Sequence, residues 1–102
     1  MDLIIKDATV IDGSGAPGFQ ADLGLNGDCI AFVGQLSDVS SAVVIQAGGR
    51  VVCPGFIDIH LHSDYHLLTN PRSESKIRQG VTTEMGGNCG HAAAPIRNQA
   101  LE

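Results

Sequence analysis

Two histidines, His60 and His62, stand two positions apart directly after an apolar segment. Side chains at alternate positions of a β-strand point to the same face, so Asp58 and both histidines are expected on one side, with Ile59 and Leu61 buried on the other. Two imidazole nitrogens presented together are typical ligands of a transition metal. The alternative is a half-solvated strand face without a ligand, since histidine is only intermediately buried on average.

The apolar residues in front of this pair favour the metal interpretation. Val51–Cys53 and Phe56–Ile57 form a nearly continuous apolar run, which is expected of a parallel strand covered on both faces. Polar side chains at the end of such a strand commonly have a function.

Length and charge limit the number of domains and the kinds of partner that the chain can have. Its 102 residues suit one small domain and fall well short of the roughly 250 residues of a typical (β/α)8 barrel. A composition with 43% hydrophobic and 17% charged residues is globular. The net charge of −5, without a Lys/Arg cluster, argues against nucleic acid or a membrane as partner. Small molecules and other proteins remain as possible partners.

The N-terminal residues predict where the chain is located, and the cysteines argue against two kinds of cysteine framework. The chain starts with Met1-Asp2, which places an acid before a very short apolar run, and it contains no stretch that could span a membrane, so we expect a cytoplasmic location. Three cysteines without a CxxC pair indicate neither a disulfide framework nor a zinc knuckle. Cys29 and Cys53 are expected in the core, whereas glycines around Cys89 should leave its sulfur accessible.

Residues 1 to about 50 read as short β segments separated by turns. Asn26-Gly27 predicts a two-residue hairpin turn of type I′, which requires positive φ at both central positions. The candidate strands are Leu3–Lys6, Thr9–Ile11, Asp22–Leu25, Cys29–Val33 and Val43–Gln46.

From residue 51 the pattern changes to strand, helix and strand, expected at Val51–Leu61, within Pro71–Gln79 and at Val81–Glu84. Ser73 or Asn70 is expected to cap the helix, and Gly80 to end it. The segment is long enough for one βαβ unit, whose two strands must be parallel.

Parallel strands that pair end on the same rim, so this topology is expected to bring Cys89 to His60 and His62. One sulfur and two imidazole nitrogens suit zinc and leave a position for water. Zinc in such a site would support metal-assisted amide hydrolysis. The sequence therefore predicts a zinc centre held by these three residues.

The sequence gives weaker support for a role of the other polar residues near the predicted centre. Asp58 and Asp64 could orient the ligand imidazoles as hydrogen-bond acceptors, or could be ordinary turn and capping groups. His66 and His91 have no partner in the pattern, and we interpret them as exposed or loop-packing histidines.

These motifs resemble a known family. The stretch Val52–His62 resembles the start of the barrel in the metal-dependent amidohydrolase superfamily. Upstream, Ile5–Gly13 and Gly27–Gly34 resemble that superfamily's N-terminal β domain. Gln79–Thr83 followed by Gly87–Gly90 is similar to the N-acyl-D-amino-acid deacylases (D-aminoacylases) within it. The resemblance covers nearly the whole chain.

The resemblance implies a mixed α/β fold class in two parts. Residues 1–50 are expected to form a small β-rich, sandwich-like domain, and residues 51–100 the first strand–helix–strand unit of a (β/α)8 metallo-hydrolase barrel. Residues 101–102 are expected to derive from cloning. Members of the family are several times longer, so we interpret the chain as an N-terminal fragment.

The resemblance also implies an activity. His60, His62 and Cys89 correspond to metal ligands of an enzyme that hydrolyses N-acyl-D-amino acids with one or two zinc ions, while Glu84 and His91 match no family position. Cys89 favours this activity over cyclic amidases such as dihydroorotase or hydantoinase, which are the alternative. No catalytic residue is assigned in the chain, which alone is expected to be inactive.

A second alternative concerns the isolated chain, which would then be a non-catalytic β-rich association module. Exposed sheet edges invite pairing with another chain, so self-association is expected.

Overall fold

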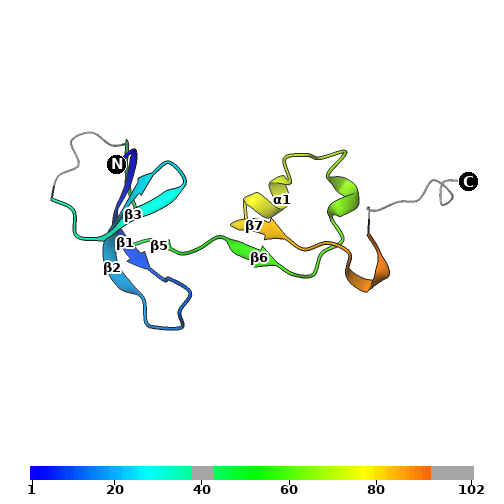
Figure 1. Cartoon of the computed structure of the whole chain (residues 1–102), viewed down its shortest axis with the longest axis horizontal. Coiled ribbons are helices and arrows are strands. Elements are labelled where there is room, and N and C mark those ends of the chain that lie inside the picture. Colours follow the sequence, from blue (N-terminus) through cyan, green and yellow to red (C-terminus); the bar gives the residue numbers. More distant parts are fainter. Residues whose placement is uncertain (38–42, 93–102) are drawn as a thin grey trace, which may run out of the picture. The chain divides into compact units, whose positions relative to one another are not determined.

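The computed structural model describes residues 1–37 and 43–92, which fall into two compact units (Figure 1). The first unit extends to Pro54 and the second begins at Gly55. Within the described ranges, no helix is long and apolar enough to cross a membrane.

The first unit is a five-stranded sheet with a central first strand. β1 pairs antiparallel with β2 and parallel with β4 and β5, and β3 extends the sheet beyond β2. Its strands are β1 (Leu3–Val10), β2 (Phe19–Asn26), β3 (Cys29–Gly34), β4 (Val43–Gln46) and β5 (Val51–Val52).

The first two predicted strands form the single strand β1, which contains a bulge. Asp7 has φ of 54°, and the register with β2 shifts between Ile5 and Ala8. An extra residue in one strand of a pair produces such a shift. The backbone N–H of Asp7 donates to Asp22 Oδ1 at 2.9 Å. The prediction of two separate strands was wrong because the Asp22 side chain holds the bulged residue Asp7 within the sheet.

The hairpin between β2 and β3 is confirmed, but its turn lies one residue later than predicted. Asn26 pairs with Cys29, so the two loop residues are Gly27 and Asp28. Only Gly27 has a positive φ, of 56°. A type I′ turn needs positive φ at both positions, so the predicted turn type is wrong.

Small side chains form the core of the first unit. The clustered residues of β1 and of β2 stand two positions apart in each strand, and Ala47 follows β4. The cluster consists of Ala8, Val10, Ala21, Leu23 and Ala47, with Ile5, Leu25 and Val52 packed against it.

Asp22 is a buried charged residue beside this core, with 8% of its surface exposed. Its carboxylate accepts the backbone N–H of Leu36 at 2.9 Å and that of Asp7, and it pairs with Lys6 Nζ at 3.1 Å. The two backbone donors are the main cause of a pKa lowered to about 2, to which Lys6 adds. Asp22 therefore connects β1, β2 and the segment that follows β3.

We expect the stability of the chain to fall between about pH 4 and pH 2. In the folded state the pKa of Asp22 is about 2, whereas in the unfolded chain it is near the ordinary value of 3.8. The unfolded state therefore binds a proton more readily between these values, and acid favours unfolding. The stabilisation is complete above that ordinary value and amounts to about 2 kcal/mol. Urea unfolding at several pH values should show a flatter acid limb in Asp22→Asn. The exposed turn variant Asp28→Asn is the control, and an equal acid limb in Asp22→Asn would contradict the assignment.

The second unit contains two parallel strands joined through a short helix. β6 (Phe56–Asp58) pairs with β7 (Val81–Glu84), and Figure 1 shows the two strands side by side. Between them lie the 3-10 helix η1 (Asp64–His66) and the helix α1 (Glu74–Ile77), and η2 (Asn88–Gly90) follows β7. The predicted strand over residues 81–84 and the parallel pairing are confirmed.

The predicted strand over residues 51–61 is wrong as one element. It is divided into β5 in the first unit and β6 in the second, with Cys53–Gly55 between them. Pro54 has no N–H to donate to a ladder, which explains the interruption. β6 ends at Asp58, before either histidine.

Burial around this segment differs from the prediction. Leu61 is buried as expected, but Ile59 is 66% exposed. Phe56 and Ile57 are exposed too, because β6 belongs to a two-stranded sheet and the described residues of the second unit do not give it the cover expected on both faces. Cys29 and Cys53 are exposed rather than in the core, whereas the expected accessibility of Cys89 is confirmed.

The helix lies within the predicted range but is only four residues long. Ser73 occupies the N-cap position with φ of 45°, but its side chain makes no capping hydrogen bond in the described part of the chain. Gly80 has φ of 83° in the turn between α1 and β7, a conformation that glycine adopts without strain.

Candidate metal centre

Three side chains with metal-binding atoms converge in the second unit. His60 and His62 follow β6, and Cys89 lies in η2 after β7. One donor atom from each lies within 4.8 Å of the others, and all three residues are exposed. The structure brings together the three residues that the sequence predicted to meet. They meet because β6 and β7 are parallel, and parallel paired strands end on the same side of their sheet.

The separations fit a single small ion. His60 Nε2 lies 3.4 Å from Cys89 Sγ. Tetrahedral zinc with typical Zn–N and Zn–S bonds separates a nitrogen and a sulfur ligand by ~3.5 Å. The rings of His60 and His62 have centroids 5.6 Å apart and an interplanar angle of 72°. Two imidazoles and one thiol are a donor set that zinc accepts.

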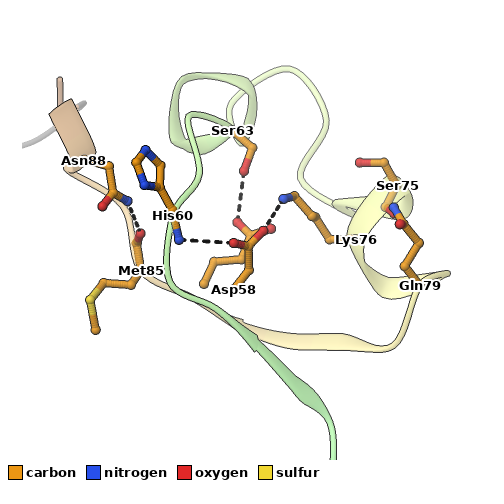
Figure 2. Close-up of polar contacts among 9 residues, drawn as sticks. Asp58, His60, Ser63, Ser75, Lys76, Gln79, Met85 and Asn88 are labelled. Atoms are coloured by element: carbon orange, nitrogen blue, oxygen red, sulfur yellow. Dashed lines mark hydrogen bonds and ion pairs between the residues drawn. The ribbon is translucent and has the colours of Figure 1, made fainter.

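The backbone at His60 is held by Asp58, as Figure 2 shows. Asp58 Oδ1 accepts the backbone N–H of His60 at 3.2 Å, and Asp58 Oδ2 pairs with Lys76 Nζ at 2.5 Å. The hydrogen bond from Lys76 is the main cause that lowers the pKa of Asp58, and the His60 N–H adds to it. The Asp58 carboxylate is therefore favoured in its ionised form, and it contacts the main chain of one of the three converging residues. Its predicted role toward the imidazoles stays a prediction.

Cys89 lies in a tight loop with unusual backbone angles. Its own φ is 58°, and Gly87 and Gly90 have φ of 86° and 74°. Asn88 Nδ2 donates to the Met85 carbonyl at 2.8 Å (Figure 2). A non-glycine residue in the left-handed region is uncommon and clusters at functional sites. The loop thus holds the sulfur in place at a cost in backbone strain.

The remaining residues that sequence reasoning named lie around this group. Asp64 begins η1, and a Cβ at Gly86 would lie 3.5 Å from its Oδ2, so it is close to the segment after β7. His91 stacks edge-on against His62, with ring centroids 6.2 Å apart. His66 is exposed at the end of η1, as expected.

Two residues of this unit had no predicted role. Lys76 forms the ion pair with Asp58, and Glu84 accepts Ser63 Oγ at 3.1 Å through Oε2. Asp58 and Glu84 are register partners on β6 and β7. The alternation of β7 in the sequence could have placed Glu84 beside Asp58, but no local signal directs Lys76 toward them.

Known proteins resemble the chain closely. It is 50% identical to D-aminoacylase of Alcaligenes xylosoxydans xylosoxydans over 93% of its own length and 20% of that enzyme. A crystal structure of D-aminoacylase matches it with a TM-score of 0.85 and 53% identity, covering 93% of this chain and 20% of that one. The chain spans about a fifth of the length of these relatives.

A further solved structure contains a metal. N-acyl-D-glutamate deacylase from Bordetella bronchiseptica, in complex with zinc and a phosphonate inhibitor, matches with a TM-score of 0.82 and 42% identity, covering 92% of this chain and 20% of that one. The resemblance to the deacylases is therefore confirmed. The model of the amidohydrolase family matches residues 43–98, which is more than half of the chain and includes all three converging side chains. The chain belongs to the amidohydrolase family.

Proposed function

We propose that the protein to which this chain belongs is a zinc-dependent hydrolase of N-acyl-D-amino acids, which it converts to a carboxylate and a free D-amino acid. The observation that carries the proposal is the convergence of His60, His62 and Cys89 within 4.8 Å. Its relatives at 42–53% identity include D-aminoacylase and a zinc-complexed N-acyl-D-glutamate deacylase.

In this proposal His60, His62 and Cys89 hold one zinc ion or share two. When bound, zinc polarises the amide carbonyl and acidifies water. His60 faces Cys89 through Nε2, so it would bind through that atom and keep its proton on Nδ1. Cys89 would bind as the thiolate, so its proton leaves when the ion enters. Asp58 keeps the His60 main chain in place while this happens.

The architecture supports a barrel in the complete protein. β6 and β7 are parallel and connected through α1, as the first strand–helix–strand unit of a (β/α)8 barrel requires. The functional groups follow the carboxyl ends of both strands, where active sites of such barrels lie. We infer that residues from Gly55 onward begin this barrel, while residues up to Pro54 form the smaller β domain. A cytoplasmic location stays a prediction.

The test uses the protein extended to the length of its relatives and loaded with zinc. We expect release of D-amino acid from N-acetyl-D-amino acids, no release from the L forms, and no ring opening of cyclic amides such as dihydroorotate. Ring opening alone would favour the cyclic amidase alternative. The 102-residue chain is expected to show no turnover above a zinc-only control, because a closed barrel is needed to surround the substrate. Turnover by the chain would contradict this.

A further inference from the structure

We propose that Lys76 is a positioning residue of the metal centre, which acts by holding the Asp58 carboxylate that fixes the backbone at His60. The inference rests on the proposed zinc site, in that it explains how one ligand of that site is kept in place. Figure 2 shows the connected contacts, from the side chain of Lys76 to Asp58 and from Asp58 to the His60 N–H.

Each carboxylate oxygen of Asp58 accepts one of these two hydrogen bonds. Oδ2 receives Lys76 Nζ at 2.5 Å, and Oδ1 receives the His60 N–H at 3.2 Å. The two side chains of the ion pair are 24% and 26% exposed, so water competes less with this contact than on an open surface. A carboxylate held at one oxygen by a cation presents the other in a fixed direction, which orients the amide that it accepts.

Glu84 explains why a cation is needed at this place. It pairs in register with Asp58 across the two strands, and like charges opposite each other destabilise a strand pair. Glu84 Oε1 is buried and has no hydrogen-bond partner in the part of the chain that the structure describes. The carboxylate of Asp58 is the first cause that raises the pKa of Lys76, and the charge of Glu84 adds to it. Lys76 thus offsets the repulsion at the end of β6, immediately before His60.

The same ion pair attaches α1 to the strands. None of the four residues of α1 is buried, so apolar packing contributes little to its position. Lys76 reaches from α1 to β6 and is a direct polar link from the helix to the segment that carries the histidines. Arg72, by contrast, pairs with Glu74 at 3.7 Å while its side chain is 83% exposed. Arg72 is therefore a matched control cation from the same stretch of chain.

The test compares zinc affinity and backbone protection in the same variants. Competition against a chromophoric chelator should show zinc binding about 10-fold weaker in Lys76→Met. This is the lower end of the loss in metal affinity that follows when a group that orients a ligand is removed. Lys76→Arg should recover most of the affinity, and Arg72→Met should match the unmodified chain. Hydrogen exchange of the His60 amide should accelerate in Lys76→Met and remain slow in both other variants.

A double-mutant cycle tests whether Lys76 acts through Asp58. Asp58→Asn keeps an oxygen that can accept the His60 N–H but loses the charge that pairs with Lys76. If the two residues act as one unit, Lys76→Met combined with Asp58→Asn weakens zinc binding no more than the stronger single change. Additive losses would overturn the proposal, since they require Lys76 to act by another route.

The outcomes separate this inference from the proposed zinc site. Unchanged zinc affinity and unchanged His60 exchange in Lys76→Met would overturn the positioning role. If the unmodified chain binds no zinc but His60 exchange still responds to Lys76→Met, the zinc site fails and the positioning of His60 stands. Should Lys76→Met fail to fold, Asp58→Asn takes its place, and wild-type His60 exchange and zinc affinity in that variant would overturn the proposal.

Discussion

Replacing Cys89 with serine is expected to weaken zinc binding by the chain at least about 100-fold at neutral pH, because changes to groups that merely orient ligands already cost 10- to 100-fold. The serine hydroxyl stays protonated at this pH and cannot replace a thiolate donor. Cys89 Sγ lies 3.4 Å from His60 Nε2, so its loss removes one of three converging donors. The measurement is a zinc titration against a competing chelator under reducing conditions.

The chain supplies its own controls for this experiment. Cys29 and Cys53 are also free and exposed, but both lie in the first unit. Cys29→Ser and Cys53→Ser should therefore bind zinc as the unmodified chain does, whereas His60→Ala should lose affinity as Cys89→Ser does. Equal losses in all three cysteine variants would indicate non-specific thiol binding and would contradict the site.

Gly55→Ala is expected to push β6 away from β7 and to destabilise the second unit by about 1–3 kcal/mol, the usual cost of overpacking. A Cβ at Gly55 would overlap Oγ1 and Cγ2 of Thr82 and would lie 2.8 Å from the Thr82 Cβ. Rotation of the threonine relieves only the first two contacts. Because His60 follows β6 and Cys89 follows β7, zinc affinity should fall together with stability. Thermal unfolding and the chelator titration measure both.

A rescue and a control make the steric argument specific. Thr82→Gly combined with Gly55→Ala removes the overlapping atoms and should recover much of the zinc affinity. Gly86→Ala is the matched control, because a Cβ there meets Asp64 only at ordinary contact distances of 3.5 Å or more. If Gly55→Ala binds zinc like the unmodified chain, β6 and β7 do not position the ligands as we describe.

The sequence predicted which side chains converge better than it predicted which residues are buried. The bounds of β7 followed from the local pattern of the sequence. The meeting of Cys89 with the histidines followed from the rule that parallel paired strands end on the same side. Burial depends on what covers a strand, and the described second unit has only two strands. Ile59 is therefore exposed although its alternation with the histidines suggested a buried face.

Details of the sheet depend on contacts between residues far apart in the sequence. The bulge at Asp7 is held by Asp22, which lies fifteen residues later, and no local pattern indicates this bond. Lys76 was missed for the same reason, because its partner Asp58 lies eighteen residues away on another element. Turn and strand patterns describe neighbours along the chain, whereas these ion pairs and bulges are determined by the packed fold.

X-ray absorption at the zinc edge of the zinc-loaded chain would test the central claim most directly, since it reports the atoms bound to the ion. We predict one sulfur at about 2.3 Å together with nitrogen neighbours at about 2.0–2.1 Å, and loss of the sulfur in Cys89→Ser. A zinc ion surrounded by nitrogen and oxygen alone, or a sulfur signal that persists in Cys89→Ser, would contradict a centre formed by His60, His62 and Cys89.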